Sequence, residues 1–318
     1  MKVPNSLISE IRTARSFLIA SHINPDGDAL GSTLALGDAL KALGKKVTMF
    51  SRDGVPEIYR FMPGWKGIKT SCSKIPAGQP LLLLLDCNSP DRAAIDALSF
   101  CRTAVIDHHK TESSFGDIRW IDKGAAATGL MVYRLIRSLK APLTRAMAAN
   151  LYTAIAVDTG VFRYSNTDEQ VLLAAADLVK AGACPGSIAE KLHEQWTDGR
   201  FDLLNLSLQT FTKKNGIAIM CVTKDMMRKT GTSESDTENF ANFPRMIDSV
   251  KISALIREAE DGRLKISMRS KGNVDVSRIA AEMGGGGHKN AAGFRIKSDM
   301  DTVKKILSDA CTRLLQKR

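Results

Sequence analysis

The stretch TAVIDHHKTE (residues 103–112) runs from apolar residues directly into an acid and two adjacent histidines, Asp107, His108 and His109. A short apolar run of this kind is typical of a strand that is buried on both faces of a parallel sheet. A carboxylate and two imidazoles at the end of such a strand are costly to remove from water unless they have partners. The stretch therefore predicts a core strand that carries a polar site at its carboxyl end.

The first half of the chain repeats this pattern. The further β-rich or aliphatic runs are SFLIASH (16–22), PLLLLLDC (80–87) and TAIAVDTG (153–160). Apolar residues at helical spacing predict helices over 29–43, 128–140 and 168–181. We expect Gly44 to follow the end of the first helix and Thr167 to be the N-cap of the third. The alternation predicts an α/β domain, with a parallel sheet covered by helices on both faces.

The second half of the chain has a different organisation. Residues 186–213 have a polar helical pattern without a strand, which suits a connector. The strand-like segments that follow are GIAIMCVT (216–223), VKISALIRE (250–258), GRLKISMRS (262–270) and GFRIKS (293–298). Asn-Gly at 215–216 and Asp-Gly at 261–262 predict hairpins, and a helix over about 300–316 closes the chain. We expect domains at 1–186 and 214–318, the second a smaller mixed α/β domain, joined by a helical linker at 187–213.

The composition is that of a globular protein with anionic partners. The 318 residues are 44% hydrophobic, and a formal net charge of +11 favours nucleotides, nucleic acid or phosphates as ligands. The six cysteines form no C-x-x-C pair, so we expect neither a disulfide framework nor a zinc ribbon. The N-terminus lacks a signal-peptide core, and LLLLL at 81–85 is too short to span a bilayer. We therefore expect a soluble, cytoplasmic protein without a membrane partner, and a homodimer is left open.

Acids and histidines follow each apolar run of the first half. They are His22, Asp26 and Asp28 after the first run, Asp86 after the second, Asp107, His108 and His109 after the third, and Asp158 within the fourth. Each cluster alone is as well explained by a turn or a helix cap. The carboxyl ends of parallel strands share one edge, however, and carboxylates gathered there repel unless cations neutralise them. Carboxylate and imidazole ligands suit Mn, Fe or Co, and two such ions form a clamp for attack on phosphorus.

The second half has a glycine-rich signal of its own, IAAEMGGGGHKNAAGF (279–294). Four glycines before His288 predict a loop whose bare backbone can point N–H groups at an anion. Arg269, on a predicted strand, can bind a phosphate in a bidentate manner. The alternative is an ordinary flexible surface loop. We predict a phosphate site formed by Arg269, Lys271, Gly285, Gly286, Gly287 and His288.

These motifs together resemble those of a known superfamily. HINPDGD (22–28), Asp86 in LLLLLDCNSPDR, DHH at 107–109 and AVDTGVF (156–162) are similar to the four motifs of the DHH phosphoesterases. SMRS (267–270) followed by DVSRIAAEMGGGGHKNAAGF (275–294) resembles the DHHA1 substrate-binding domain. The order and spacing agree over nearly the whole chain. The size and two-domain layout are most similar to the bifunctional oligoribonuclease and pAp phosphatase (nanoRNase) branch.

The resemblance implies a role for each matching residue. His22 and Asp26 would hold one metal, Asp28, His108 and Asp158 a second, and Asp86 would bridge them. His109 would lie beside the scissile phosphate, and Asp107 would orient an imidazole or add a ligand at the first metal. Arg269, Gly286 and His288 would bind the terminal phosphate or the nucleobase end of the substrate. Two divalent ions are implied, Mn²⁺ first, with Mg²⁺ or Co²⁺ as alternatives.

The implied activity is metal-dependent hydrolysis of very short oligoribonucleotides to mononucleotides. The same chemistry would remove the 3′-phosphate of adenosine 3′,5′-bisphosphate (pAp). The alternatives are a cyclic-dinucleotide phosphodiesterase, a hydrolase of linear dinucleotides such as pApA or pGpG, and a non-catalytic nucleic-acid-binding protein. A manganese pyrophosphatase shares the metal motifs, but the glycine-rich second domain fits it poorly. The polar stretch 228–240 is expected to be a loop at the edge of the substrate cleft.

Overall fold

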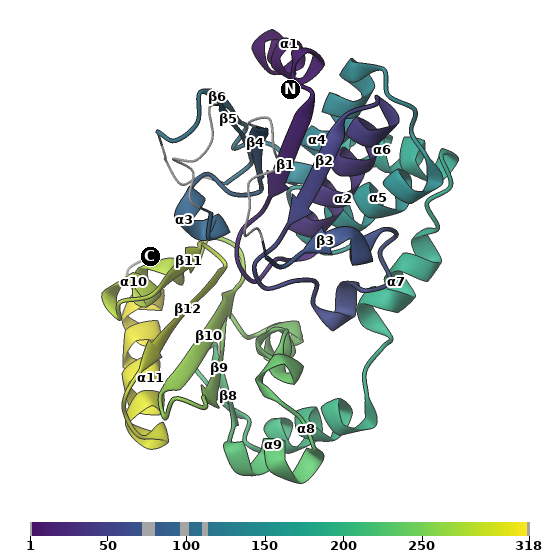
Figure 1. The fold of residues 1–318 in the computed structure, drawn as a ribbon. Coiled ribbons are helices and arrows are strands. Elements are labelled where there is room, and N and C mark those ends of the chain that lie inside the picture. Colours follow the sequence, from purple (N-terminus) through teal and green to yellow (C-terminus); the bar gives the residue numbers. More distant parts are fainter. Residues whose placement is uncertain (1, 72–79, 96–101, 110–113, 317–318) are drawn as a thin grey trace. The chain divides into compact units, whose positions relative to one another are not determined.

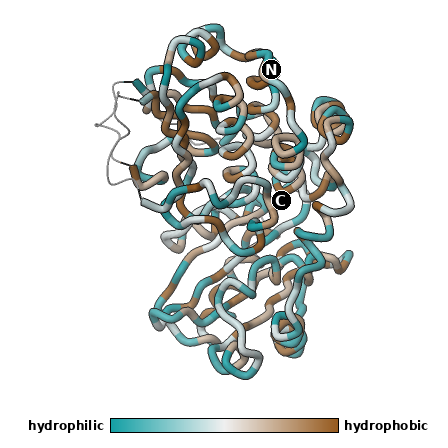
Figure 2. The backbone as a smooth tube through the Cα atoms, turned by 45° about the vertical axis from the view of Figure 1, so that its right-hand side comes forward, coloured by the Kyte–Doolittle hydropathy of each residue, from teal (hydrophilic) through white to brown (hydrophobic). Residues whose placement is uncertain are grey.

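The computed structural model describes residues 2–71, 80–95, 102–109 and 114–316 (Figure 1). The chain forms two compact units, Met1–Gln195 and Trp196–Arg318. The boundary between them falls inside the stretch expected to be a linker. Apolar residues recur along the strands and helices of both units (Figure 2). Within the described residues no single helix is long and apolar enough to cross a membrane, although the bent pair Glu169–Lys180 (α6) and Pro185–His193 (α7) passes that test jointly, by length and composition alone.

The N-terminal unit is built on a parallel sheet of six strands in the order β3-β2-β1-β4-β5-β6. Its strands are β1 (Ser16–Ala20), β2 (Lys46–Phe50), β3 (Ile68–Lys69), β4 (Leu81–Leu85), β5 (Thr103–Asp107) and β6 (Ile118–Ile121). All five pairings between neighbouring strands are parallel. The strands predicted in 16–22, 80–87 and 103–109 are confirmed as β1, β4 and β5. The carboxyl ends of these three neighbouring strands therefore meet at one edge of the sheet.

Helices cover this sheet mainly on one face. The helices are α1 (Asn5–Thr13), α2 (Gly27–Ala42), α3 (Pro90–Ala93), α4 (Thr128–Leu139), α5 (Arg145–Asp158), α6 (Glu169–Lys180) and α7 (Pro185–His193), with 3-10 helices η1 (Glu57–Tyr59) and η2 (Trp65–Gly67). Alternate residues of β4, such as Leu81 and Leu83, join the large core formed with α2, α4 and α5. Leu82 and Leu84 point to the opposite face, where Ala93 of the short helix α3 packs in a smaller cluster.

The prediction of a strand at 153–160 is wrong, because these residues belong mainly to α5, which ends at Asp158. A short apolar run such as TAIAV cannot be distinguished from a buried helix by periodicity alone. Thr144 caps α5 by accepting a hydrogen bond from the backbone N–H of Met147, and most of the helix is buried in the core. Asp158 therefore reaches the polar site from the C-terminal end of a helix and not from the end of a strand.

The helices α2 and α5 approach each other closely at Gly31. A Cβ atom at this position would lie 2.4 Å from the backbone oxygen of Asn150 and 2.9 Å from the Cβ atom of Ala154. We expect Gly31→Ala to lower the free energy of unfolding by about 1–3 kcal/mol, because the added methyl group overpacks a core contact. Urea unfolding measures this. Gly186→Ala in α7, where a Cβ atom meets nothing within 4 Å, is the control and should be neutral or slightly stabilising. Equal stability of the two variants would contradict the packing argument.

The C-terminal unit contains a mixed sheet of six strands in the order β11-β12-β10-β9-β8-β7. Its strands are β7 (Thr212–Lys214), β8 (Ile217–Val222), β9 (Ile252–Glu258), β10 (Leu264–Ser270), β11 (Gly286–His288) and β12 (Ala291–Ile296). The hairpins predicted at 215–216 and 261–262 are confirmed as the antiparallel pairs β7–β8 and β9–β10. Only β8 and β9 pair in parallel among these strands.

Helices pack on both faces of this second sheet. They are α8 (Asp198–Gln209), α9 (Lys224–Thr230), α10 (Ser277–Glu282) and α11 (Met300–Gln316), with 3-10 helices η4 (Glu234–Thr237), η5 (Phe240–Asn242) and η6 (Pro244–Met246). Residues of α10 and α11, among them Ile279 and Leu307, form one core with the sheet. Leu203 of α8 and Phe240 of η5 belong to the core on the opposite face. The predicted terminal helix is confirmed as α11.

Local predictions near helix ends and glycines need correction. Asp168, not Thr167, is the N-cap of α6, and its carboxylate accepts the backbone N–H of Val171 at 2.9 Å. The stretch 186–213 is not free of strand, because β7 begins at Thr212. The predicted glycine-rich loop is in part a strand, since 286–288 pairs with β12.

The stretch 228–240 is also not a simple polar loop. It contains the end of α9 and the 3-10 helix η4, and it reaches the fully buried Phe240. Glu234 forms an ion pair with the buried Arg257, and it accepts the backbone N–H of Glu260 at 2.9 Å. These contacts explain Glu234 by the internal structure of the C-terminal unit.

Candidate metal centre

The loop between β1 and α2, with the first turn of α2, carries three of the predicted ligands. Asp26 is the N-cap of α2, and its Oδ1 accepts the backbone N–H groups of Asp28 and Ala29, both at 3.0 Å. The backbone oxygen of Ile23 lies 2.8 Å from Nδ1 of His22, which leaves Nε2 of the ring to face Asp86. A capping residue and the first turn of one helix thus place two carboxylates at the same strand end.

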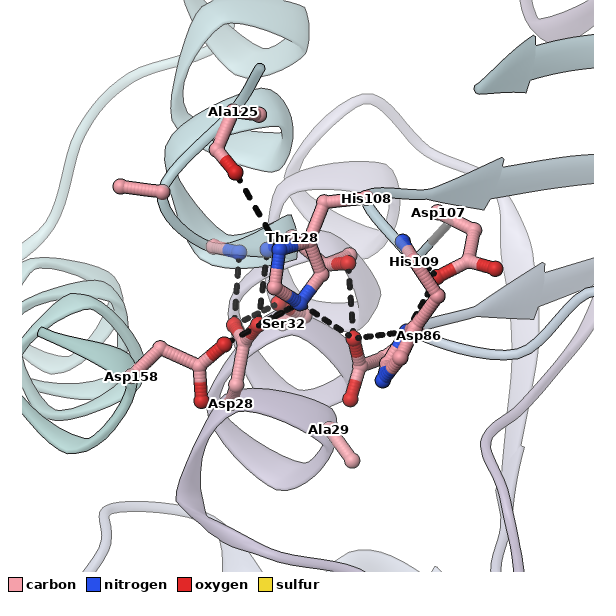
Figure 3. Close-up of polar contacts among 12 residues, drawn as sticks. Asp28, Ala29, Ser32, Asp86, Asp107, His108, His109, Ala125, Thr128 and Asp158 are labelled. Atoms are coloured by element: carbon pink, nitrogen blue, oxygen red, sulfur yellow. Dashed lines mark hydrogen bonds and ion pairs between the residues drawn. The ribbon is translucent and has the colours of Figure 1, made fainter. Parts of the chain in front are cut away.

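Asp86 lies at the centre of the cluster. It follows β4 in a left-handed backbone conformation (φ 57°) and is 1% exposed. Its Oδ2 atom is 3.3 Å from Nε2 of His22. Its Oδ1 atom is 3.4 Å from Nε2 of His108 and 3.5 Å from Nδ1 of His109 (Figure 3). The two oxygens of one carboxylate therefore face different histidines.

Three sets of donor atoms lie close enough to share a metal ion. They are His22, Asp26 and Asp86; Asp28, His108 and Asp158; and Asp86, His108 and His109, with the donor atoms of each set within 4.8 Å of one another. Nε2 of His108 is 3.1 Å from Oδ2 of Asp158 and 3.8 Å from Oδ2 of Asp28 (Figure 3). Seven predicted residues thus gather from β1–α2, β4, β5 and α5, although the sequence separates the first and last by over one hundred positions.

Asp107 belongs to none of these three sets. It is the last residue of β5, is fully buried, and its Oδ1 atom lies 2.7 Å from Nδ1 of His109. The same oxygen accepts the backbone N–H of His109 at 3.1 Å. Oδ2 of Asp107 has no hydrogen-bond partner among the described residues. The geometry matches a carboxylate that orients an imidazole ring.

Residues that the sequence reasoning did not identify hold Asp28. Its Oδ2 atom accepts the backbone N–H of Thr128, and its Oδ1 atom accepts that of Gly129, both at 2.7 Å. The hydroxyl of Ser32, one turn further along α2, donates to Oδ1 at 3.2 Å. Thr128 and Gly129 begin α4, so Asp28 satisfies N–H groups that have no partner within the helix. The only sequence signal was the start of a helix near 128.

The buried carboxylates repel one another. Burial, with the charges of Asp86 and Asp158, raises the pKa of Asp26 to about 6. The same causes raise the pKa of Asp28 well above its ordinary value. Burial also raises the pKa of Asp86, but hydrogen bonds from the neighbouring histidines outweigh burial and hold it below the ordinary value. Such a cluster fits divalent cations, because they would neutralise the charge that burial penalises.

The histidines neutralise part of this negative charge by binding protons. Burial lowers the pKa of His108, but hydrogen bonds with Asp158 and Asp86 outweigh it and raise the pKa to about 12. Burial likewise lowers the pKa of His22, and Asp86 raises it to about 9. Cation binding requires neutral imidazoles, so metal ions and protons compete for this cluster.

This competition predicts that rising pH lowers the stability of the metal-free protein and increases the stabilisation gained from Mn²⁺. The raised pKa values of His22 and His108 contribute stability that is complete below the ordinary value of 6.5 and is lost as pH rises through about 9 and about 12. We expect the unfolding free energy of the metal-free protein to fall by a few kcal/mol between about pH 6.5 and pH 9, because each unit of pKa shift corresponds to about 1.4 kcal/mol. The stabilisation gained on adding Mn²⁺ should increase over the same interval. Thermal unfolding with chelator and with excess Mn²⁺ measures both, and metal-free stability that rises with pH would contradict the account.

In the C-terminal unit, Arg269, Gly285 and Gly286 line a cavity of about 630 Å³. Arg263, Lys265 and Arg295 line it too, which makes it basic. The cavity lies along β10 and β12 and accounts for three of the residues predicted to bind phosphate.

The other predicted residues occupy different places. Lys271 donates through Nζ to the backbone oxygen of Ile247 at 2.8 Å and is not among the residues that line the cavity. A Cβ atom at Gly287 would lie 2.5 Å from the backbone of β12, so close strand pairing requires glycine there. His288 ends β11 and is exposed. A Cβ atom at Gly286, in contrast, would meet nothing within 4 Å.

The comparisons with known proteins agree with this architecture. Residues 16–155 match the N-terminal domain of the DHH family, and residues 214–315 match the DHHA1 domain. The chain is 35% identical over 294 residues to a bifunctional oligoribonuclease and PAP phosphatase of Thermus thermophilus, covering 92% of this chain and 88% of that protein. It is 28% identical over 313 residues to the protein of the same name from Bacillus subtilis, covering 95% and 96% of the two chains.

A solved structure extends the agreement to the whole fold. The crystal structure of an exopolyphosphatase-related protein from Bacteroides fragilis matches with a TM-score of 0.91, at 28% identity and over 98% of both chains. Both domain matches, the relatives and the cluster of acids and histidines lead to one assignment. The chain belongs to the DHH family of metal-dependent phosphoesterases and carries a DHHA1 domain in its C-terminal half.

Proposed function

We propose that this enzyme hydrolyses very short oligoribonucleotides to mononucleotides and removes the 3′-phosphate of pAp. The observation that carries the proposal is the position of Asp86, whose two oxygens face the two flanking ligand sets. The names of the two relatives, bifunctional oligoribonuclease and PAP phosphatase, support the substrate class. The same names favour these substrates over cyclic dinucleotides.

Two divalent cations would occupy the cluster. His22 and Asp26 would hold one, Asp28, His108 and Asp158 the other, and Asp86 would be shared. The mixed oxygen and imidazole donors favour Mn²⁺, with Mg²⁺ or Co²⁺ as substitutes. When bound, such a pair supplies an acidified water for attack on phosphorus and neutralises charge on the phosphoryl oxygens.

His109 and Asp107 have a supporting part in this chemistry. The contact of 2.7 Å between Nδ1 of His109 and Oδ1 of Asp107 fixes the orientation of the ring. In that orientation His109 would contact a phosphoryl oxygen of the bound substrate. Asp107 would hold the imidazole of His109 in one orientation, as a buried carboxylate does for an imidazole in other hydrolases.

The basic cavity of the C-terminal unit would bind a second phosphate of the substrate. Arg269 offers a planar guanidinium that matches phosphate geometry, and Gly286 exposes its backbone where no side chain intervenes. His288 would add a further contact from the end of β11. Lys271, Gly285 and Gly287 would hold the strands that shape this surface. Both pAp and a linear dinucleotide have a phosphoester to cleave and another phosphate to bind.

We infer the same division of labour from the domain organisation. Residues 1–186 would form the catalytic domain and 214–318 the substrate-binding domain, with 187–213 joining them. A cytoplasmic location follows from the substrates. It also agrees with the free thiols of Cys87, Cys184, Cys221 and Cys311, whereas Cys72 and Cys101 lie outside the described residues.

Competition between the two substrates tests whether one site serves both. Protein stripped by a chelator and restored with Mn²⁺ should release phosphate from pAp and AMP from pApA. Each substrate should inhibit hydrolysis of the other competitively, with an inhibition constant close to its own KM, because both would occupy the same metal centre. Rates that simply add in a mixture would contradict a shared site. No product from either substrate would overturn the proposed substrate class.

A further inference from the structure

The segment 125–129, which leads from the loop after β6 into the first turn of α4, contacts the ligand cluster at three positions. The backbone oxygen of Ala125 lies 3.2 Å from Nδ1 of His108. The backbone N–H groups of Thr128 and Gly129 bind the carboxylate of Asp28, as described above. The segment is buried from Ala125 to Gly129. Its position therefore fixes ligands that come from two other elements, α2 and the end of β5.

The side chain of Thr128 makes a contact of a different kind. Its hydroxyl donates to Oδ1 of Asp86 at 3.0 Å (Figure 3). Thr128 is buried from solvent, with a relative exposure of 0%. A hydrogen bond to a buried carboxylate is among the stronger ones, because neither partner can exchange it for water.

The cap geometry shows that this hydroxyl does not serve its own helix. Ala127 is the N-cap of α4 and makes no side-chain capping bond. Thr128 is the first residue inside the helix, and its backbone N–H is already bound by Asp28. The hydroxyl is therefore directed across to β4, where it meets Asp86.

The contact determines how the carboxylate of Asp86 is turned. Rotation about the bond between Cβ and Cγ of an aspartate is soft, so the carboxylate plane needs an external partner to be fixed. With Oδ1 held by Thr128, that oxygen stays 3.4 Å from Nε2 of His108, and Oδ2 stays 3.3 Å from Nε2 of His22. In this orientation each of the two flanking ligand sets has one oxygen of Asp86 beside its histidine.

We infer that Thr128 is a positioning residue that divides the two oxygens of Asp86 between two cation sites. The inference rests on the proposed metal centre and adds a residue that neither the DHH motifs nor the donor sets contain. Loss of the hydroxyl leaves the backbone contacts of Asp28 intact. The effect should therefore concern the sharing of Asp86, and with it the binding of the second ion.

Thr128→Val tests this with little change in volume. We expect chelator-stripped wild-type protein to bind two Mn²⁺ ions by calorimetry and to give the electron paramagnetic resonance signal of a coupled Mn²⁺ pair. The variant should bind the first ion normally and the second with roughly 10- to 100-fold lower affinity, the range typical of partners that orient a metal ligand. The pair signal should be lost at stoichiometric Mn²⁺, and Thr128→Ser should restore both readouts.

Thr33→Val is the matched control. Thr33 is a buried threonine of α2 whose hydroxyl has no hydrogen-bond partner among the described residues, so its loss should leave both readouts unchanged. Should Thr128→Val fail to fold, Thr128→Ala removes the same hydroxyl without crowding and is expected to show the same loss. Normal binding of the second ion by a folded Thr128 variant would overturn the inference alone. A wild-type protein that binds fewer than two ions would overturn the metal centre itself.

Discussion

Asp86→Asn is expected to lower kcat/KM for pApA at least about 10³-fold, a loss of roughly 4 kcal/mol of transition-state stabilisation. Asp86 is 1% exposed and has an oxygen directed at each of two ligand sets. Asparagine has the same shape but only one oxygen and no charge, so it cannot be shared by two cations. Steady-state rates at saturating Mn²⁺ measure the loss.

Two control experiments test whether this loss is specific to the metal centre. Asp91→Asn, an exposed acid in α3 a few residues further along the chain, should keep wild-type activity. Without metal, Asp86→Asn should fold, and Mn²⁺ should no longer raise its melting temperature as it does for the wild type. An active Asp86→Asn protein would contradict the proposed role of this residue.

Arg269→Ala should raise the KM for pAp by roughly 10- to 100-fold, because a charge-assisted hydrogen bond to a phosphate is worth about 1.5–3 kcal/mol. Arg269 lines the basic cavity of the C-terminal unit and is not one of the predicted metal ligands. The kcat should change much less, since the lost contact is made in the ground state and in the transition state alike. Arg269→Lys should recover only part of the affinity, as lysine keeps the charge but not the bidentate geometry.

Arg278→Ala provides the control for charge alone. This arginine of α10 has a side chain that is 73% exposed and pairs with Asp275. It lowers the net charge by the same amount as Arg269→Ala, and its KM should stay near the wild-type value. If both variants raised KM equally, general attraction of the anion would explain the effect and the cavity would not.

The sequence was sufficient to predict that these acids and histidines gather in one cluster. Asp86 and Asp107 follow or end apolar runs that are typical of buried strands, and parallel strands bring their carboxyl ends together. Asp158 lies in the cluster as the sequence predicts, but its local structure differs from the prediction. Its apolar run was interpreted as a strand, whereas α5 delivers the carboxylate from a helix end.

The contacts that hold the predicted metal ligands in place could not be predicted from the sequence. Thr128 and Gly129 hold Asp28 through backbone N–H groups, which every residue but proline possesses and which leave no sequence signal. Their partner lies one hundred residues away, so only the tertiary structure joins them. In the same way, close strand pairing explains glycine at 287, although composition alone favoured a loop.

The most direct test is hydrolysis of pApA and of a long single-stranded RNA by chelator-stripped protein, with Mn²⁺ restored or withheld. We expect the protein to release AMP from pApA only when Mn²⁺ is present and to cleave the long RNA much more slowly. AMP release without any divalent ion would contradict the metal centre. Equal rates on pApA and the long RNA would contradict the assignment to short substrates.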